Sequence, residues 1–339
     1  MSANPKISII VPIWNAGKYL KPALESVVAQ NLSDWECICV NNASTDNSAS
    51  VVKRFAKKDS RFILINRPDN GGVSIGRNAG LDIARGKYVI FLDQDDLLAP
   101  DVFDMYWGLA KKYNADMIRG KSKFIQNNFV LSDADDRQTV TAQYFDNPKS
   151  DFIKTAENSK YGSWVLVWKC CFKRSAIRGI RFDTRFFAGG EDDIFMITAV
   201  NKIKNFVQSD NIVYYYRKSE TSVTNKGICC NPLVMKLYQI IMPIVQKMHF
   251  KDSKNPWLKW AYDNEMKRMY YEVVWKPLRY GKGDDITSGV GIIRDLRANG
   301  FIDLARMPIG RRIAVWMFIT GFKEVLRIII NLYSFFKKK

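Results

Sequence analysis

Three carboxylates directly follow an apolar stretch of the chain. Residues 87–92 read Lys-Tyr-Val-Ile-Phe-Leu, and residues 93–96 read Asp-Gln-Asp-Asp. Hard cations such as Mg²⁺ and Mn²⁺ take oxygen ligands, commonly one or two carboxylates together with phosphate oxygens and water. Acids at the end of a strand therefore suit a cation that holds a diphosphate. The alternative is a turn in which Asp96 or Asp101 caps the following helix.

A second acidic cluster, Gly190-Glu191-Asp192-Asp193, lies about a hundred residues further along the chain. Like charges held close together raise the pKa of at least one carboxylate, and a carboxylate with a raised pKa is a better general base. The alternative is that these acids only open a helix, where the helix dipole favours negative charge.

Several other kinds of chemistry are disfavoured. The chain has one histidine, His249, so a Ser-His-Asp or Cys-His nucleophile is not expected. We interpret His249 as a surface or interface residue without a catalytic role. The glycines of residues 71–80 match neither a P-loop, which needs Gly-Lys-Ser/Thr, nor the Gly-x-Gly-x-x-Gly dinucleotide motif.

The net charge of +18 is unevenly distributed over the 339 residues. Residues 1–120 carry 15 basic and 13 acidic side chains, which leaves 37 basic and 21 acidic side chains for residues 121–339. A basic half predicts an anionic partner such as a phosphorylated substrate, a phospholipid surface or nucleic acid.

The six cysteines predict a reducing compartment. No two of them are spaced as Cys-x-x-Cys, and Cys37 and Cys39 lie in an apolar run where they are expected to pack in the core. The first residues lack the apolar stretch of a signal peptide. We therefore expect a cytoplasmic protein.

Strands and helices are expected to alternate in the first third of the chain. Apolar runs predict buried strands at 7–11, 35–40, 62–65 and 88–92, and stripes of apolar residues with helical spacing lie between or after them. This order predicts a parallel sheet that binds ligands at the carboxyl ends of its strands. Residues 121–160 are interpreted as an irregular connector or a mobile flap rather than a separate domain. The chain is expected to be mainly helical from about residue 230.

Six motifs in order resemble those of the family 2 glycosyltransferases, inverting enzymes of the GT-A fold that build bacterial surface polysaccharides. They span roughly the first 225 residues, and their sequences are Ile9-Ile-Val-Pro-Ile-Trp-Asn15, Val40-Asn-Asn-Ala-Ser-Thr-Asp-Asn-Ser48, Asn70-Gly-Gly-Val-Ser-Ile-Gly-Arg-Asn-Ala-Gly80, Phe91-Leu-Asp-Gln-Asp-Asp96, Gly190-Glu-Asp-Asp-Ile-Phe195, and Tyr214-Tyr-Tyr-Arg217 with Ser222-Val-Thr224.

The resemblance implies a fold and a division of the chain. The fold class is α/β, with a Rossmann-like and mostly parallel sheet flanked by helices and a mainly helical C-terminal extension. Residues 1–225 would form the GT-A domain, with a nucleotide-sugar half at 1–120 and an acceptor half at 121–225. Residues 226–339 would form a basic helical region.

The resemblance also assigns roles on the donor side. Pro12 and Trp14 would embrace the nucleotide base, since a flat indole stacks well on uracil. Asn41 and Asn42 stand where the family has an aspartate pair that reads uracil. Amides can both donate to and accept from uracil, but this departure weakens the case for a uridine-linked donor.

The remaining implied roles concern the diphosphate and the reaction. Arg77 would contact phosphate oxygens, for which a guanidinium fork is well suited. Asp93 and Gln94 would bind the nucleotide-sugar, and Asp95 would bind Mn²⁺ or Mg²⁺. In the acidic motif near residue 190, Asp192 is the expected catalytic base, and Glu191 would orient it or contact acceptor hydroxyls.

The C-terminal region is rich in both basic and apolar residues. Residues 294–339 hold ten Lys or Arg and three acids, and the apolar run at 313–322 is shorter than the roughly 20 residues of a membrane span. Its aromatic residues and terminal lysines suit a helix lying in the membrane interface. The alternative is a helix that packs on the catalytic domain.

Together these features predict an inverting, metal-dependent transferase. It would move a hexose or N-acetylhexosamine from a nucleotide-sugar to a hydroxyl of a lipid-linked or lipooligosaccharide glycan, with a β-linkage, at the inner face of the cell membrane. The expected donor is a UDP-sugar. Two alternatives are a metal-dependent nucleotidyltransferase, which needs a second metal ligand, and a basic nucleic-acid-binding protein, which has no use for the acidic motifs.

Overall fold

The computed structural model describes residues 5–130, 132, 139–157, 165–186, 189–217, 232–281, 283–320 and 326. The chain divides into two compact units. The first consists of Met1–Phe187 and Glu191–Ser219, and the second of Ala188–Gly190 and Glu220–Lys339.

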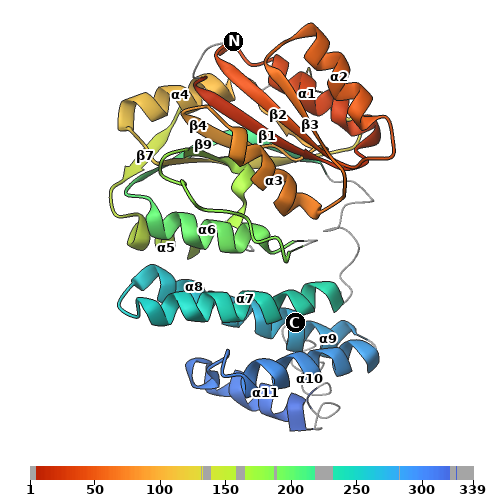
Figure 1. The fold of residues 1–339 in the computed structure, drawn as a ribbon. Helices are drawn as coiled ribbons and strands as arrows, with labels where there is room; N and C mark the ends of the chain where they lie inside the picture. The colour runs from red at the N-terminus through yellow and green to blue at the C-terminus, as the bar shows by residue number, and fades with distance from the viewer. Residues whose placement is uncertain are drawn as a thin grey trace. The chain divides into compact units, whose positions relative to one another are not determined.

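A mixed sheet forms the centre of the first unit (Figure 1). Its described strands are β1 (Ile7–Ile13), β2 (Trp35–Asn42), β3 (Phe62–Arg67), β4 (Tyr88–Phe91), β5 (Leu97–Leu98), β6 (Met117–Ile125), β7 (Ala142–Phe145), β8 (Cys170–Lys173) and β9 (Phe206–Arg217). They run in the order β3-β2-β1-β4-β8-β6-β9-β5, with β7 also paired to β9. The four strands predicted from apolar runs are β1 to β4, and they are mutually parallel as expected.

Beyond β4 the sheet is no longer purely parallel. Strand β8 is antiparallel to both β4 and β6, β6 is parallel to β9, and β5 and β7 are antiparallel to β9. The result is the mostly parallel α/β sheet flanked by helices that the sequence predicts, with antiparallel additions at one side.

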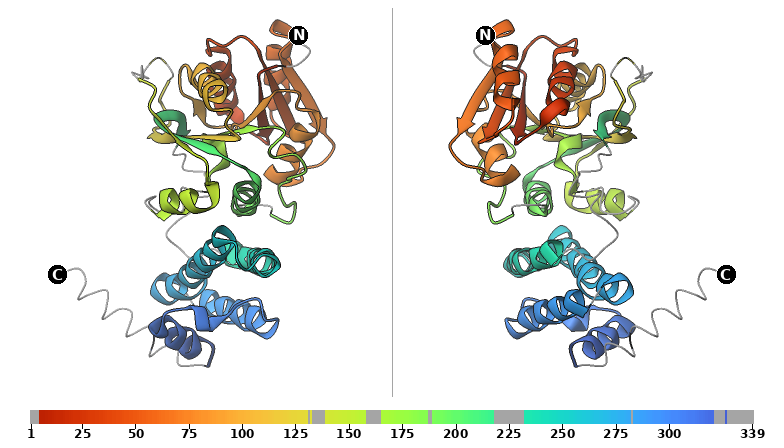
Figure 2. Two further views of the ribbon diagram at one scale, coloured as in Figure 1. Left: turned by 90° about the vertical axis from the view of Figure 1, so that its left-hand side faces the viewer. Right: turned by 90° about the vertical axis from the view of Figure 1, so that its right-hand side faces the viewer.

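Helices cover both faces of this sheet, and Figure 2 shows the same layers from two further sides. The helices of the first unit are α1 (Leu20–Val28), α2 (Ser48–Lys58), α3 (Gly72–Ile83), α4 (Val102–Tyr113), α5 (Pro148–Glu157) and α6 (Glu191–Lys202). Helices α1, α2 and α4 pack on the face that carries Ile9 and Val11. Helix α3 packs on the opposite face, where Gly80 meets Ile10, and Phe195 of α6 contacts Phe91 there. Both faces of β1 are therefore buried, which explains its continuous apolar sequence.

The interpretation of residues 121–160 as an irregular connector is wrong for much of the described segment. Strand β6 continues to Ile125, and β7 and α5 follow. The outer half of β6, residues 121–124, is exposed and mostly polar, so its sequence lacks the apolar run that revealed the buried strands. The acidic run at 133–137 lies outside the described residues.

Two glycines let α3 approach the sheet closely. A Cβ at position 80 would lie 2.4 Å from Cγ2 of Ile10. A Cβ at position 76 would lie 2.7 Å from Nδ2 of Asn42 and 3.0 Å from Cβ of Pro12. Since real side chains do not tolerate such distances, glycine at these positions is what brings Arg77 over the carboxyl ends of the strands.

The described part of the second unit is helical, as predicted for the chain after residue 230. Its helices are α7 (Pro232–Lys251), α8 (Pro256–Met269), a π-helical segment (Tyr270–Trp275), α9 (Lys276–Tyr280), α10 (Gly283–Ala298) and α11 (Ile309–Thr320). Helix α7 packs against α8 and α10, and α10 packs against α11. Among the described helices, none combines the length and the apolar character that crossing a membrane requires.

The expectation of a surface position for His249 is wrong. Its side chain is buried and lies parallel to the ring of Tyr262, with 5.7 Å between ring centroids. Helical periodicity places a residue on a face of α7, but packing against the following helix α8 decides that this face is covered. Cys37 and Cys39 are buried in the core, as predicted.

A buried carboxylate ties the amino ends of three strands together. Glu36 of β2 accepts hydrogen bonds from Oγ of Ser8 at 2.7 Å and from the backbone and guanidinium nitrogens of Arg85 at 2.7–2.9 Å. The Ser8 hydroxyl in turn accepts from the backbone nitrogen of Gly86, just before β4, at 2.8 Å. This network holds β1, β2 and the start of β4 together at their amino ends, whereas the acidic motif lies at the carboxyl end of β4.

We expect Glu36→Ala to lower the free energy of unfolding by about 2 kcal/mol, because Ser8 and Arg85 lose a charged acceptor. The Arg85 side chain is 41% exposed, so water compensates part of the loss. Urea unfolding followed by circular dichroism measures the change. The control is Asp69→Ala, which breaks the exposed Arg67 pair and should cost no more than about 0.5 kcal/mol. Equal effects of the two substitutions would contradict a structural role for Glu36.

Candidate active site

The guanidinium of Arg77 joins acids from two distant parts of the chain. One terminal nitrogen donates to Asp192 Oδ1 at 2.7 Å and to Glu191 Oε1 at 3.2 Å, and the other donates to Asp93 Oδ1 at 2.9 Å. Arg77 is 2% exposed, and its guanidinium lies 5.1 Å from the ring centroid of Phe182. The acids after β4 and the acids that begin α6 therefore belong to one site.

This network places three carboxyl groups around one guanidinium. Burial raises the pKa of Asp192 to about 8, with Arg77 opposing the shift and Glu191 and Asp93 adding to it. Burial also raises the pKa of Glu191, and its Oε2 atom has no hydrogen-bond partner. Asp192 is therefore a carboxylate of raised basicity held in a defined orientation, as a general base requires.

The structure tests the two alternative interpretations of the acidic motifs, namely capping of a helix and opening of a helix. Asp101 precedes α4 but makes no capping hydrogen bond, and the Asp96 carboxylate is bound elsewhere, so the capping interpretation is wrong. Glu191, Asp192 and Asp193 do lie in the first turn of α6. The ion pairs of Glu191 and Asp192 with Arg77 add to the dipole effect and connect this turn to the strand ends.

The acidic turn after β4 is held from the far side by β9. The Tyr214 hydroxyl donates to Asp96 Oδ2 at 2.8 Å and accepts from the backbone nitrogen of Asp93 at 3.1 Å. The backbone nitrogen of Arg217 donates to Asp96 Oδ1 at 2.7 Å, and its guanidinium donates to the carbonyl of Asp95 at 3.0 Å. Tyr214 and Arg217 lie in the Tyr-Tyr-Tyr-Arg motif, but the motif alone does not indicate which groups they contact.

The Asp95 side chain is left available for a ligand. Apart from its own backbone nitrogen, we find no hydrogen-bond donor to its carboxylate among the described residues, and burial together with the charge of Asp93 raises its pKa to about 6. No cluster of three or more potential metal-binding side chains occurs in the described parts of the chain. The Asp95 carboxylate fits Mg²⁺ or Mn²⁺, because these ions usually bind through one or two carboxylates and complete their shell with phosphate oxygens and water.

Gln94 and Trp14 connect the acidic turn to the end of β1. The Gln94 amide accepts from the backbone nitrogen of Trp14 at 2.6 Å and donates to its carbonyl at 3.0 Å. The Trp14 side chain is 50% exposed. This pairing fixes the backbone of Trp14 and leaves its indole open to solvent, where a base could stack on it.

Asn41 and Asn42 are both buried at the end of β2. Asn41 donates to Asn66 at 3.0 Å and accepts from the backbone nitrogen of Ser44 at 3.2 Å. Asn42 donates to the carbonyl of Gly72 at 3.5 Å, whereas its Oδ1 atom has no partner. Asn42 also lies beside Pro12 at the close approach of Gly76.

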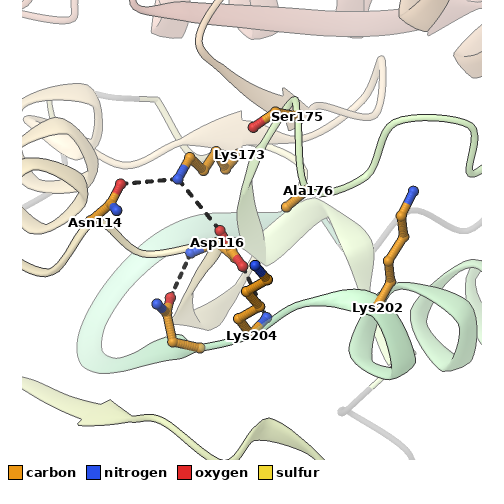
Figure 3. A pocket seen from close by; sticks show the side chains of 8 residues that line it. Asn114, Asp116, Lys173, Ser175, Ala176, Lys202 and Lys204 are labelled. Carbon is orange, nitrogen blue, oxygen red and sulfur yellow. Dashed lines mark hydrogen bonds and ion pairs between the residues drawn. The ribbon is translucent and has the colours of Figure 1, made fainter.

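The predicted site residues therefore lie together around the carboxyl ends of β1, β2 and β4. Contacts through Arg77, Gln94 and Gly76 link them into one region. The motif residues 222–224 lie outside the described residues. A separate pocket of about 390 Å³ contains Asp116 and several lysines but none of the predicted site residues (Figure 3).

Comparison with known proteins identifies relatives of the chain. The model of the family described as "Glycosyl transferase family 2" matches residues 8–178. The chain is 29% identical to the glycosyltransferase EpsJ of Bacillus subtilis over 230 residues, which are 65% of this chain and 63% of EpsJ. It is 31% identical to a poly(ribitol-phosphate) beta-glucosyltransferase of Bacillus spizizenii over 220 residues, which are 62% of this chain but only 32% of that protein.

The fold has solved counterparts. The crystal structure of S. aureus TarS residues 1–349 in complex with UDP-GlcNAc superimposes with a TM-score of 0.73 at 18% identity, covering 97% of this chain and 91% of that one. At this identity the likeness concerns the fold, which includes both the α/β sheet and the helical C-terminal region.

The raised pKa of Asp192 predicts a pH dependence of stability. The folded state keeps a proton on Asp192 up to about pH 8, whereas an unfolded aspartate releases it near pH 4. Between these values the folded state binds more protons, so its stability falls as the pH rises. We expect Asp192→Asn to lose less stability than the wild type between about pH 5 and pH 8. The midpoints of urea unfolding at pH 5 and pH 8 measure this loss of stability. Equal losses in the variant and the wild type would contradict the raised pKa of Asp192.

Proposed function

The chain belongs to glycosyl transferase family 2, and we propose that it transfers a hexose or N-acetylhexosamine from a UDP-sugar to a hydroxyl of a cell-surface glycan. The observation that carries this proposal is the Arg77 network, in which Asp93 of the donor side meets Asp192 of the acceptor side. The names of the relatives, which include a poly(ribitol-phosphate) beta-glucosyltransferase, support an acceptor that belongs to the cell surface.

In the proposed reaction, Asp192 takes the proton of the acceptor hydroxyl as its oxygen attacks the anomeric carbon. The bond between that carbon and the diphosphate breaks on the opposite face, and the electron pair leaves with the nucleoside diphosphate. A single displacement inverts the α-linked donor and forms a β-linkage. Glu191 is proposed to hold Asp192 and to contact acceptor hydroxyls, because both acids share one nitrogen of Arg77.

On the donor side, Trp14 is proposed to stack on the base, with Pro12, Asn41 and Asn42 beside it. The unpartnered Oδ1 of Asn42 could accept from the N3–H of uracil, which keeps a uridine donor compatible with the amide pair. Asp93 and Gln94 are proposed to contact the ribose and the donor sugar. A divalent cation held by Asp95 and the diphosphate would neutralise the charge that develops on the leaving group.

The phosphate contact expected of Arg77 stays a prediction, and the structure adds carboxylate partners to it. Both of its terminal nitrogens already bind carboxylates, so it is proposed to set the geometry of the acids and to offset their charge near the diphosphate. A nucleotidyltransferase would have no use for Asp192 in this network, and a nucleic-acid-binding protein would have no use for the network at all.

We expect Asp192→Asn to lower sugar transfer by about a thousandfold, because the acceptor hydroxyl loses its general base. Nucleoside diphosphate release from a panel of sugar nucleotides measures transfer. Stabilisation of the variant by UDP with Mn²⁺ should match that of the wild type in a thermal-shift assay.

The matched control is Asp210→Asn, which removes an exposed carboxylate paired with Lys121 and should leave transfer unchanged. Full turnover by the Asp192 variant would refute the base. Absence of any release from the panel by the wild-type protein would refute the proposed activity.

We also propose that the second unit binds the inner face of the cell membrane. Ile309, Ile313 and Trp316 of α11 are exposed, and their spacing of four and three residues places them on one face of the helix beside the exposed Arg312. An exposed apolar stripe with a basic neighbour suits the interface of an anionic membrane. Much of the basic tail that motivated this expectation, residues 321–325 and 327–339, lies outside the described residues.

Replacing both Ile313 and Trp316 by glutamate should weaken binding to anionic lipid vesicles by about tenfold or more, because two apolar side chains no longer leave water. Co-sedimentation with vesicles measures the partition. The control is Phe124→Glu, which changes an exposed aromatic residue of the first unit. Undiminished sedimentation of the double variant would argue against α11 as the contact.

A further inference from the structure

A lysine is buried next to the proposed acceptor side without a counterion. Lys169 ends a single 3₁₀ turn, Val167–Lys169, that leads into β8, and it is only 5% exposed. Among the described residues we find neither an ion pair nor a hydrogen bond to its ammonium group. Its backbone is fixed, because the carbonyl accepts from the Tyr106 hydroxyl at 3.0 Å.

A second cation lies beside it. Arg119 of β6 is 4% exposed and pairs across the sheet with Cys170, the residue after Lys169. Its guanidinium lies 5.2 Å from the ring centroid of Phe152. Burial and the charge of Arg119 together lower the pKa of Lys169 to about 7. Two cations are thus held close together where water is largely excluded.

This pair lies close to the proposed base. The backbone nitrogen of Val167, in the same turn as Lys169, donates to Asp192 Oδ2 at 3.5 Å. Burial raises the pKa of the Cys170 thiol. The charges of Arg119 and Lys169 lower this pKa, and the charge of Asp192 raises it. The turn that carries Lys169 thus contacts Asp192 through Val167, and Arg119 lies opposite Cys170 at the start of β8.

Core packing alone does not explain these residue types. An apolar side chain of similar length, such as methionine, would fill the same space without the cost of removing an ammonium group from water. A lysine that is buried without a partner, next to a second cation, is instead suited to receive an anion when a ligand enters.

We propose that Lys169 and Arg119 bind an oxyanion of the acceptor, a phosphate or a carboxylate, close to the hydroxyl that Asp192 deprotonates. This inference rests on the proposed function and narrows its acceptor to an anionic glycan or polyol. The oxyanion would supply the charge that Lys169 lacks and would place the acceptor hydroxyl relative to the base.

Binding of matched probes to the full chain tests this proposal. Glycerol 3-phosphate is compared with glycerol, and glucuronate with glucose, by isothermal titration calorimetry in saturating UDP and Mn²⁺, so that the diphosphate site is already filled. We expect at least one anionic probe to bind the wild type about tenfold or more tightly than its neutral counterpart. Preference for the phosphate or for the carboxylate then identifies the source of the oxyanion.

Two variants locate the binding. Lys169→Met should abolish the preference for the anionic probe, whereas Lys204→Met, which removes an exposed lysine of the pocket in Figure 3, should retain it. A wild type without preference, or a Lys169→Met protein that keeps it, would overturn the proposal. UDP binding by the wild type is measured separately. No UDP binding would refute the proposed function. UDP binding without a preference for the anionic probe would refute only the oxyanion site.

A second measurement needs no variant and covers the case in which Lys169→Met fails to fold. Carbamylation of Lys169 by cyanate is followed by mass spectrometry with and without the preferred probe. Protection of Lys169, with unchanged labelling of Lys204, supports the proposal. Equal labelling of Lys169 in both samples overturns it.

Discussion

The structure of the site depends on a single buried guanidinium. Arg77 pairs with Asp93, Glu191 and Asp192, and no other residue in the described site brings these acids together. One guanidinium holds the three carboxyl groups in place, and it does not offset the effect of burial on the pKa of Glu191 and Asp192. The geometry of the site is therefore specified, while burial keeps the pKa values of Asp95 and Asp192 raised.

The scaffold around Arg77 serves the same arrangement. Gly76 and Gly80 let α3 lie against β1 and β2, which carries the guanidinium over the strand ends. On the other side, Tyr214 and Arg217 of β9 hold the acidic turn through Asp96, and Gln94 ties that turn to β1. Each of these contacts joins segments far apart in the chain, so the site is a property of the assembled sheet.

Local patterns were sufficient where a segment is buried on both faces or carries a motif. The four parallel strands were predicted from apolar runs, and the acids of residues 93–96 and 190–193 were singled out from their types and spacing. Patterns failed where burial depends on distant partners. The outer half of β6 is exposed, no residue of β7 is fully buried, α5 buries only three of its ten residues, and His249 is covered by Tyr262 of the next helix.

The sequence by itself determined the fold class, the family and the residue types available for chemistry, because these follow from local periodicity and from motifs in a fixed order. Only the tertiary structure decided which charges meet. It directed Arg77 to three carboxylates and left the Asp95 carboxylate available for a ligand. It also buried Lys169, which lacks a counterion, near Arg119. The reason is physical, since the energy of a charge depends on its burial and its neighbours, and both are set by residues that are distant in the chain.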